Sequence, residues 1–222
     1  MTFINTVNFM GFPDTQQLAE PGGKRERTKI RNRSAILTAA RRIFATQGYE
    51  AATVRDIVRG TDLAVGTFYQ YFRDKDDVFT AVADETLAEI RARLRTVRRD
   101  RSLTLPERIY EGYRAFFFFV VEERPLYEVL DRNIVALASD AATETQLLAL
   151  QEIREDLMPD FSEDPGAKQD EDFLAAAFMG TGMTVARAML TRDNPDPVEA
   201  ANFCTRFVLA GFEEMKQPSA TS

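Results

Sequence analysis

The sequence predicts an all-α protein of about nine helices, with a small three-helix domain at the N-terminal end and a larger helical domain after it. Three observations support this prediction. Apolar residues recur at helical spacing, as at Ile36, Ala40 and Ile43. Pro106 and Pro125 stand where helices are expected to open, a position that tolerates proline. No stretch combines the alternation and the hairpin turns that β-strands require.

The N-terminal domain is expected to consist of short elements with sharp breaks. Its first helix ends at Gly48, which can act as a C-terminal cap. Thr53 begins a second helix, because its hydroxyl can accept hydrogen bonds from the free N–H groups of a first turn. The segment 60–62 breaks that helix, and Asp62 suits the break because Asp tolerates the left-handed conformation. A third short helix is expected over residues 64–71.

The larger domain is expected to begin with a long helix that Asp74 caps and that reaches about Arg99. Five further helices are expected over residues 106–123, 125–138, 140–158, 170–192 and 197–216. We therefore divide the chain into a flexible N-terminal tail, an N-terminal domain, a larger domain and a C-terminal tail, over residues 1–23, 24–78, 79–216 and 217–222.

The amino-acid composition excludes several kinds of catalytic and metal-binding site. The chain of 222 residues has no His and one Cys, so the usual general base, a disulfide and a thiolate metal cluster are absent. We expect no cofactor and no metal site. Cys204 is expected to be a buried small apolar residue. No apolar run of membrane-spanning length and no signal peptide are expected, which favours a soluble cytoplasmic protein without a membrane partner.

The charge is distributed unevenly along the chain. The net charge is −7, but residues 24–78 hold 12 Lys and Arg against 7 Asp and Glu, a net of +5. Residues 79–222 hold 16 Lys and Arg against 26 Asp and Glu, a net of −10. A basic end on an acidic body is typical of a protein that touches a polyanion with one end only.

Two short helices separated by a three-residue break have the geometry of a helix-turn-helix. The second of them needs an exposed face of small and polar groups to enter the major groove of DNA. The residues expected to face the bases are Val65, Gly66, Thr67, Tyr69 and Gln70. Phosphate contacts are expected from basic residues of the first helix, from the start of the second helix and from residues after the third, namely Arg25, Arg27, Lys29, Thr53, Arg55, Tyr71 and Lys75.

Three stretches carry a resemblance to a known family. They read ILTAARRIFATQGY from Ile36, TVRDIV from Thr53 and GTFYQYFRDKDDVF from Gly66. Together they resemble the DNA-binding domain of the TetR family over residues 29–79. The resemblance implies a homodimer that binds a palindromic double-stranded DNA operator, most often as a repressor. The sequence departs from the family pattern at Thr61-Asp62, Ala64 and Val65, and Ala64 cannot supply a side-chain cap for the recognition helix.

The last two helices carry stripes of small and apolar residues, which allow close packing between helices. The TetR resemblance implies that these stripes form a four-helix dimer interface, although they can equally serve an intramolecular core. The predicted interface residues are Phe173, Ala176, Ala177, Gly180, Thr184, Arg187, Phe203, Phe207 and Ala210.

Four consecutive Phe residues, 116–119, cannot share one helix face, so their helix is expected to be buried on all sides. Some of these rings are expected to line a pocket for a hydrophobic small molecule, with adaptable Met residues on the opposite wall. Arg114 and Arg132 are candidates for a phosphate or thioester group, or for surface salt bridges. The predicted ligand-binding set is Arg114, Phe116, Phe117, Val120, Leu126, Tyr127, Leu130, Arg132, Ile134, Phe178, Met179 and Met183.

A second resemblance concerns the effector. Residues 113–133 are similar to the TetR branch that represses fatty-acid-synthesis genes and senses acyl-CoA, which implies a fatty acyl-CoA effector. A drug-like or aromatic effector is the alternative. Two other classes of function stay open: a helical DNA-binding adaptor without a small ligand, and an enzyme. Without His, an enzyme would have to rely on carboxylates, and the acidic runs 122–123 and 170–172 are interpreted as solvated surface and a helix N-terminus.

Overall fold

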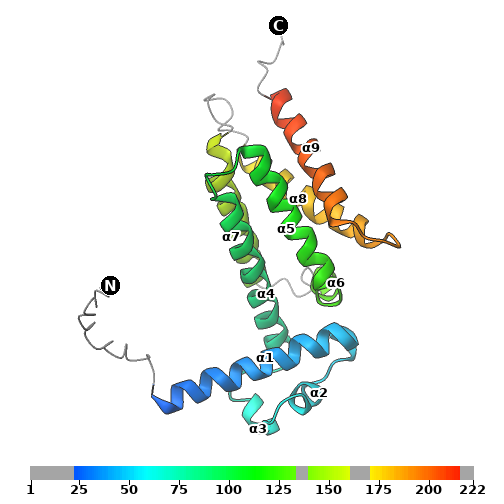
Figure 1. Ribbon diagram of the computed structural model, residues 1–222. Helices are drawn as coiled ribbons and strands as arrows, with labels where there is room; N and C mark the ends of the chain where they lie inside the picture. The colour runs from blue at the N-terminus through cyan, green and yellow to red at the C-terminus, as the bar shows by residue number, and fades with distance from the viewer. Residues whose placement is uncertain (1–22, 134–139, 161–170, 216–222) are drawn as a thin grey trace, which may run out of the picture.

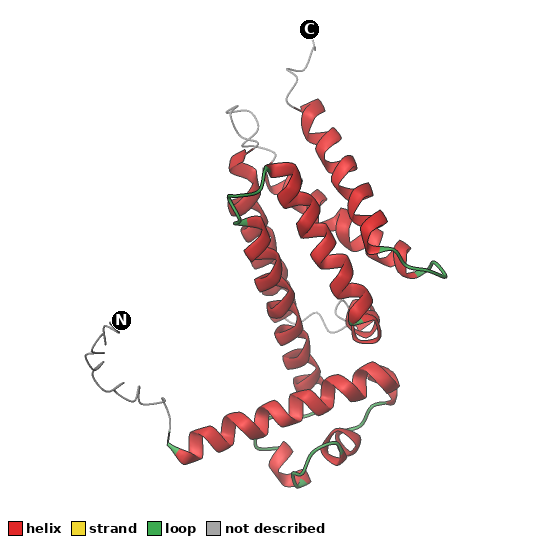
Figure 2. Ribbon diagram, viewed as in Figure 1, coloured by secondary structure: helices red, strands yellow, loops and turns green. Residues whose placement is uncertain are grey.

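The computed structural model describes residues 23–133, 140–160 and 171–215, and every regular element within these ranges is helical (Figure 2). This confirms the predicted all-α fold of about nine helices. In chain order the helices are α1 Lys24–Ala51, α2 Val54–Arg59, α3 Val65–Phe68, α4 Lys75–Arg98, α5 Leu105–Glu122, α6 Arg124–Asn133, α7 Asp140–Leu157 with the 3₁₀ turn Met158–Asp160, α8 Glu171–Leu190 and α9 Pro197–Met215.

The helices form two groups, which we call the head and the body. The head consists of α1, α2 and α3 and lies at one end of the molecule, and α4 rises from it into the body (Figure 1). In the body α5 packs against α4, α8 and α9, while α7 packs against α4 and α8. The loop between α4 and α5 lies at the far end from the head (Figure 1).

Gly48 is a kink rather than a plain helix end. Its backbone has φ 78° and ψ 169°, and one further helical turn follows before α1 ends at Ala51. This region of backbone space is accessible almost only to glycine. The predicted helix stop therefore falls at the right residue, but the chain changes direction there and does not leave the helix for good.

The break between α2 and α3 works differently from the prediction. No described residue other than glycine has a positive φ, so Asp62 is not left-handed. Instead, the Thr61 hydroxyl donates to the Val58 carbonyl at 2.8 Å and accepts the Leu63 N–H at 3.2 Å. Gly60 is required for space, because a Cβ there would lie 3.2 Å from the Ala39 Cβ and 2.8 Å from an Arg42 nitrogen.

α3 is shorter than predicted and ends at Phe68. Beyond it the Gln70 N–H bonds to the Thr67 carbonyl and the Tyr71 N–H to the Phe68 carbonyl, three residues back in each case. Such bonds tighten the chain into turns of the 3₁₀ type. As expected, Ala64 makes no side-chain cap at the start of α3, whereas Thr53 and Asp74 cap α2 and α4.

Two apolar clusters hold the molecule together. The head core contains buried residues of α1, α2 and α3 together with the first turns of α4, from Val78 to Ala83. It also contains Leu126, Val129 and Leu130 of α6. The body core is built from α5, α7, α8 and α9. α6 is therefore shared: it follows the central helix of the body and buries one face in the head.

α8 is long and apolar enough, by length and composition alone, to cross a membrane. This corrects the expectation that the chain holds no such run. In the structure α8 packs against α5, α7 and α9, and the Tyr113 hydroxyl of α5 donates to its Phe178 carbonyl at 2.9 Å. Core helices of globular proteins meet the same length and composition criterion.

Candidate nucleic-acid interface and effector-binding body

The surface of α3 divides into an inward and an outward face. Phe68 and Phe72 are buried in the head core, with their ring centroids 5.8 Å apart. On the opposite face the structure exposes four of the five residues predicted to read bases, and Thr67 is half-buried; the four are Val65, Gly66, Tyr69 and Gln70. A short helix pinned by two Phe rings, with a small and polar face outward, is shaped for a major groove.

The start of α2 is built as a capped helix N-terminus. The Thr53 oxygen accepts the Asp56 N–H at 3.2 Å, and its hydroxyl donates to the Asp56 carboxylate. Arg55 is exposed beside it. Because the Thr53 hydroxyl proton is already used, a phosphate at this end would have to be held by free backbone N–H groups and by Arg55.

Lys75 has a role that the sequence did not indicate. Its ammonium donates to the carbonyls of Tyr49 at 2.9 Å and of Glu50 at 3.4 Å, and lies 4.3 Å from the centroid of the Tyr49 ring. The Tyr49 hydroxyl donates to Asp76. Burial, and to a smaller extent the neighbouring Asp76 carboxylate, raises the pKa of Tyr49. Lys75 thus caps the C-terminal end of α1 by hydrogen bonding to its last carbonyl groups. Its predicted phosphate contact stays a prediction, as does that of the half-buried Tyr71.

The basic N-terminal segment forms the first turns of α1. Residues 23–31 are exposed throughout, including Arg25, Arg27 and Lys29. In Figure 1 these first turns of α1 reach past α3. The segment therefore presents its cations to one side of the recognition surface, where a DNA backbone would pass.

In the body, three of the four consecutive Phe rings are covered. Phe117 and Phe119 are buried, Phe116 is half-buried against the body core, and Phe118 is 38% exposed under the Arg114 guanidinium. The expectation of a helix buried on all sides is thus wrong at Phe118, because the neighbouring helices leave that face of α5 uncovered. Of the other predicted pocket residues, the body core holds Val120, Tyr127, Phe178 and Met179.

The remaining pocket predictions are placed elsewhere. Leu126 and Leu130 are buried in the head core, and their place in an effector pocket stays a prediction. Arg114 pairs with Glu111 at 2.7 Å and Arg132 with Glu128 at 3.4 Å. Both arginines therefore form the surface salt bridges that were the alternative interpretation. Met183 is half-buried, and Ile134 lies outside the described residues.

The predicted dimer stripes lie at the surface. Phe173 of α8 is 76% exposed, and Phe203 and Phe207 of α9 are 55% and 61% exposed, with their rings stacked 6.1 Å apart. The smaller members of the set, Ala176, Ala177, Thr184 and Ala210, are exposed and Gly180 is half-buried. Arg187 is not free on this face, because it binds Asp131 of α6 through two hydrogen bonds of 2.8 Å.

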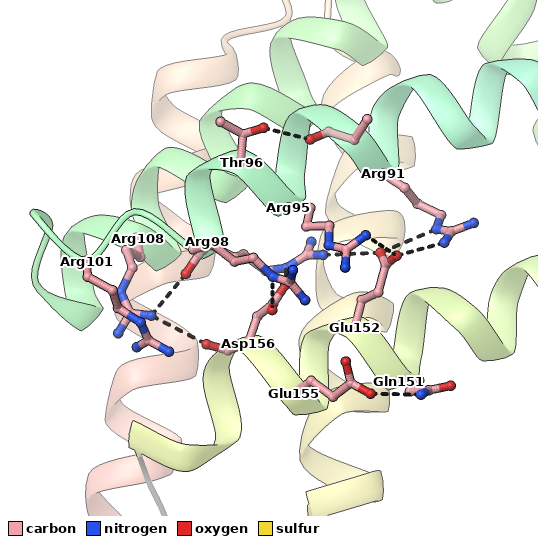
Figure 3. A network of polar contacts seen from close by, with 12 residues as sticks. Arg91, Arg95, Thr96, Arg98, Arg101, Arg108, Gln151, Glu152, Glu155 and Asp156 are labelled. Atoms are coloured by element: carbon pink, nitrogen blue, oxygen red, sulfur yellow. Dashed lines mark hydrogen bonds and ion pairs between the residues drawn. The ribbon is translucent and has the colours of Figure 1, made fainter.

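An arginine-rich cluster at the far end of α4 was not predicted (Figure 3). Arg98 and Asp156 are almost fully buried, and the Arg98 Nε lies 3.3 Å from an Asp156 oxygen. Arg99 contacts the same carboxylate at 2.7 Å, while Arg91 and Arg98 contact Glu152 at 2.7 and 3.5 Å. Burial lowers the pKa of Arg98, and Asp156 opposes this effect. The cluster ties α4 to α7.

The polar cluster also includes Arg108 of α5. Arg108 is buried, and its guanidinium donates to the Arg98 carbonyl at 3.0 Å and to Asp160 at 2.6 Å. A run of arginines in the sequence shows no periodicity that distinguishes a buried cluster from a solvated surface. For that reason the cluster emerged only from the fold.

Comparison with known proteins finds a family match in the head and a shared fold over most of the chain. The model of bacterial regulatory proteins of the tetR family matches residues 36–82, from the second half of α1 to the first turns of α4. The fold of most of the chain is that of the fatty acid degradation regulator FadR from Bacillus halodurans, with a TM-score of 0.70 and 21% identity over 80% of this chain and 94% of that one.

Curated relatives match as well. The chain is 41% identical over 61 residues to the transcriptional repressor AcnR of Corynebacterium efficiens, a match that covers 28% of this chain and 32% of the relative. It thus spans about a third of that relative's length. It is 24% identical to the transcriptional activator FasR of Mycolicibacterium smegmatis, over 87% of this chain and 90% of FasR. FadR from Bacillus subtilis, solved in complex with stearoyl-CoA, has the same fold with a TM-score of 0.65 at 18% identity, over 80% of this chain and 98% of that one.

Proposed function

We propose that this protein is a transcriptional regulator of the tetR family that binds a double-stranded DNA operator as a homodimer and responds to a hydrophobic effector in its body. It acts in the cytoplasm and catalyses no reaction. The observation that carries the proposal is the outward face of α3, where small and polar residues are exposed while Phe68 and Phe72 hold the helix in the head core. The family match covers this surface.

The recognition surface accounts for sequence-specific binding. Gln70 can form a bidentate pair with adenine, and Val65 can contact a thymine methyl group. Arg25, Arg27, Lys29 and Arg55 flank α3 and supply the phosphate contacts that fix the register. A head of this size binds weakly alone, so two copies on half-sites about 34 Å apart are needed for tight binding.

The exposed faces of α8 and α9 support the homodimer. Three Phe rings at the surface of two neighbouring helices form an apolar area that a monomer would leave in water. The small residues between them, Ala176, Ala177 and Gly180, let a second copy approach closely. A two-fold dimer uses the same patch on both subunits, which matches a palindromic operator.

We propose a fatty acyl-CoA as the effector. The support is the apolar aromatic packing between α5 and α8, where Tyr113 stacks on Phe178 at 4.6 Å and Phe116 and Met179 pack against the same core. The structural neighbours include FadR proteins, one of them solved with stearoyl-CoA. The effector must favour the form whose heads are misplaced for the operator, and α4 and α6 connect the body to the head.

The test is binding of the purified protein to DNA from upstream of its own gene, at fixed physiological salt, with and without palmitoyl-CoA. We expect specific binding that palmitoyl-CoA changes. Binding that ignores palmitoyl-CoA would remove the acyl-CoA proposal and point to a drug-like or aromatic effector. If no specific DNA is bound, either upstream or in a genome-wide selection, the regulator proposal is wrong.

A matched pair of variants assigns the binding to the surface formed by α3 and the turn that follows it. Gln70→Ala is expected to cost about 1–3 kcal/mol of discrimination between operator and random DNA. Gln47→Ala changes the same residue type at an exposed position of α1 and is expected to leave that discrimination unchanged. Equal effects of the two substitutions would contradict the assignment.

A further inference from the structure

Among the described residues, none pairs with the buried hydroxyl of Tyr127. Its ring packs against the body core, edge to face with Phe116 at 6.3 Å between ring centroids. The hydroxyl oxygen is fully covered, and no hydrogen-bond partner reaches it in the structure of the described residues. Buried polar groups in proteins are nearly always paired, so an unpaired one needs an explanation.

Tyr113 is the contrasting case in the same aromatic cluster. It is also buried, but its hydroxyl donates to the Phe178 carbonyl at 2.9 Å. A Phe at position 113 would lose that bond, whereas a Phe at position 127 would fill the same space and remove an unpaired group. The Tyr127 hydroxyl therefore contributes nothing to the folded chain alone.

The charged groups near Tyr127 do not use the hydroxyl either. Asp131 of α6 and Arg187 of α8 are the two that affect it electrostatically, and they bind each other through two hydrogen bonds of 2.8 Å. Burial and Asp131 raise the pKa of Tyr127 to about 12, with Arg187 opposing. The phenol is thus protonated at physiological pH and has a proton to donate.

We propose that the Tyr127 hydroxyl donates a hydrogen bond to a neutral oxygen of the effector, the thioester carbonyl of an acyl-CoA, and so selects effectors with an oxygen on an apolar body. The inference rests on the proposed effector-controlled function. A neutral oxygen is required because a carboxylate would need a cation, and Arg187 is already neutralised by Asp131. The aromatic surroundings supply the apolar part of the site.

Tyr127 lies on a helix that connects the effector site to the head. Tyr127 lies on the body side of α6, while Leu126 and Leu130 of the same helix are buried in the head core. An effector bonded to Tyr127 therefore touches an element whose opposite face belongs to the head. Binding can displace α6 without any intermediate helix.

The test compares Tyr127→Phe with Tyr113→Phe in the full chain without effector, by thermal unfolding. Tyr127→Phe is expected to keep or raise the Tm, because it removes an unpaired buried hydroxyl. Tyr113→Phe is expected to lower it. A fall in Tm for Tyr127→Phe that equals the fall for Tyr113→Phe would show that the hydroxyl has a partner and would overturn the inference. This arm depends on no ligand.

The second arm measures ligand affinity by calorimetry. Tyr127→Phe is expected to weaken palmitoyl-CoA binding about tenfold, the usual effect of one lost hydrogen bond. The neutral pair 2-undecanone and undecane isolates the contact: wild type is expected to prefer the ketone, and Tyr127→Phe to lose the preference. Unchanged palmitoyl-CoA affinity in the variant, or a wild type that does not distinguish the pair, would overturn the inference. Because no DNA is present, failure of operator binding is a separate result.

Discussion

At the scale of single residues, the head depends on one glycine for its backbone and on another for its surface. Gly48 has a conformation that side chains rarely adopt, yet nothing lies within 4 Å of an added Cβ. Any cost of a side chain there is therefore conformational. Gly66 has no positive φ, and its added Cβ would also meet open space.

Gly48→Ala is expected to destabilise the protein by about 1–3 kcal/mol, the cost of holding a non-glycine residue in this region. Urea unfolding at fixed temperature measures it. Gly66→Ala is the control: it should not lower stability, and it should weaken operator binding because a methyl group would stand between α3 and the bases. Equal stability of Gly48→Ala and wild type would refute the account of the kink.

Cys204 is predicted to be unreactive in the folded protein. Burial raises the pKa of its thiol from 9.0 to about 12. Since the folded pKa lies above the unfolded one, its contribution to stability is complete below pH 9 and is lost as the pH rises toward 12. A thiol reagent such as DTNB at pH 8 should react at least a hundredfold more slowly with the folded than with the denatured chain. With one Cys in the sequence, rapid reaction of the native protein would contradict this directly.

The sequence predicts local features of single residues well. The caps at Thr53 and Asp74 and the burial of Cys204 were all inferred from neighbours in the chain, and the structure confirms them. The state of the Tyr127 hydroxyl was not predictable, because whether it finds a partner depends on α8 and not on adjacent residues.

At the scale of elements, α6 shows where sequence patterns fail. Its apolar residues predict an amphipathic helix correctly, but periodicity does not say which cluster each face joins. Leu126 and Leu130 were predicted to line an effector pocket, and the structure places them in the head core. The same limit applies to the run of Phe in α5, where the neighbours alone decide that Phe118 is exposed.

Leu126→Ala is expected to destabilise the protein by about 2–5 kcal/mol, because Leu126 is buried in a packed core. The loss should appear in the head, as faster amide hydrogen exchange in α1 measured by mass spectrometry. Leu147→Ala, on the exposed side of α7, is the control and should change stability by less than about 0.5 kcal/mol. Faster exchange confined to the body would show that α6 does not support the head.

The buried ion pairs between α4 and α7 are expected to be essential for the stability of the folded protein. Asp156→Asn removes the main partner of the buried Arg98 and should cost about 3–5 kcal/mol, since a buried charge is left uncompensated. Asp172→Asn breaks the exposed pair with Arg154 and should cost less than about 1 kcal/mol. Thermal and urea unfolding of both variants measure the difference. Similar costs would mean that the cluster is solvated in solution.

At the scale of the whole molecule, fold class and recognition surface were predictable because they rest on helical periodicity and on a distinctive motif. The relation between the two domains was not, because head and body share α4 and α6 through contacts distant in sequence. The exposed stripes of α8 and α9 were predicted residue by residue, but only a second copy of the chain can show what covers them.

Phe207→Asp is expected to break the homodimer, because a charge would be buried at the centre of the proposed interface. Analytical ultracentrifugation should show a dimer for wild type and a monomer for the variant, with operator affinity lost in parallel. Phe118→Asp is the control, since Phe118 is an exposed Phe of α5, outside the predicted interface set. A monomeric wild type, or a variant that remains dimeric, would contradict the assigned interface.

The ion-pair cluster fixes one end of α4 against α7, while its first turns lie in the head core. The helix can therefore transmit a small rotation in the body to the head. The helix is held from about Ile90 onward, since Ile90 lies in the body core and Arg91 pairs with Glu152. The 16 residues from Lys75 to Ile90 span about 24 Å, so a rotation of about 5° moves the head end by about 2 Å. In the proposed two-fold dimer the two displacements add, to about 4 Å between heads that must match half-sites about 34 Å apart. A rearrangement too small to disturb the body core would thus change the spacing of the two heads.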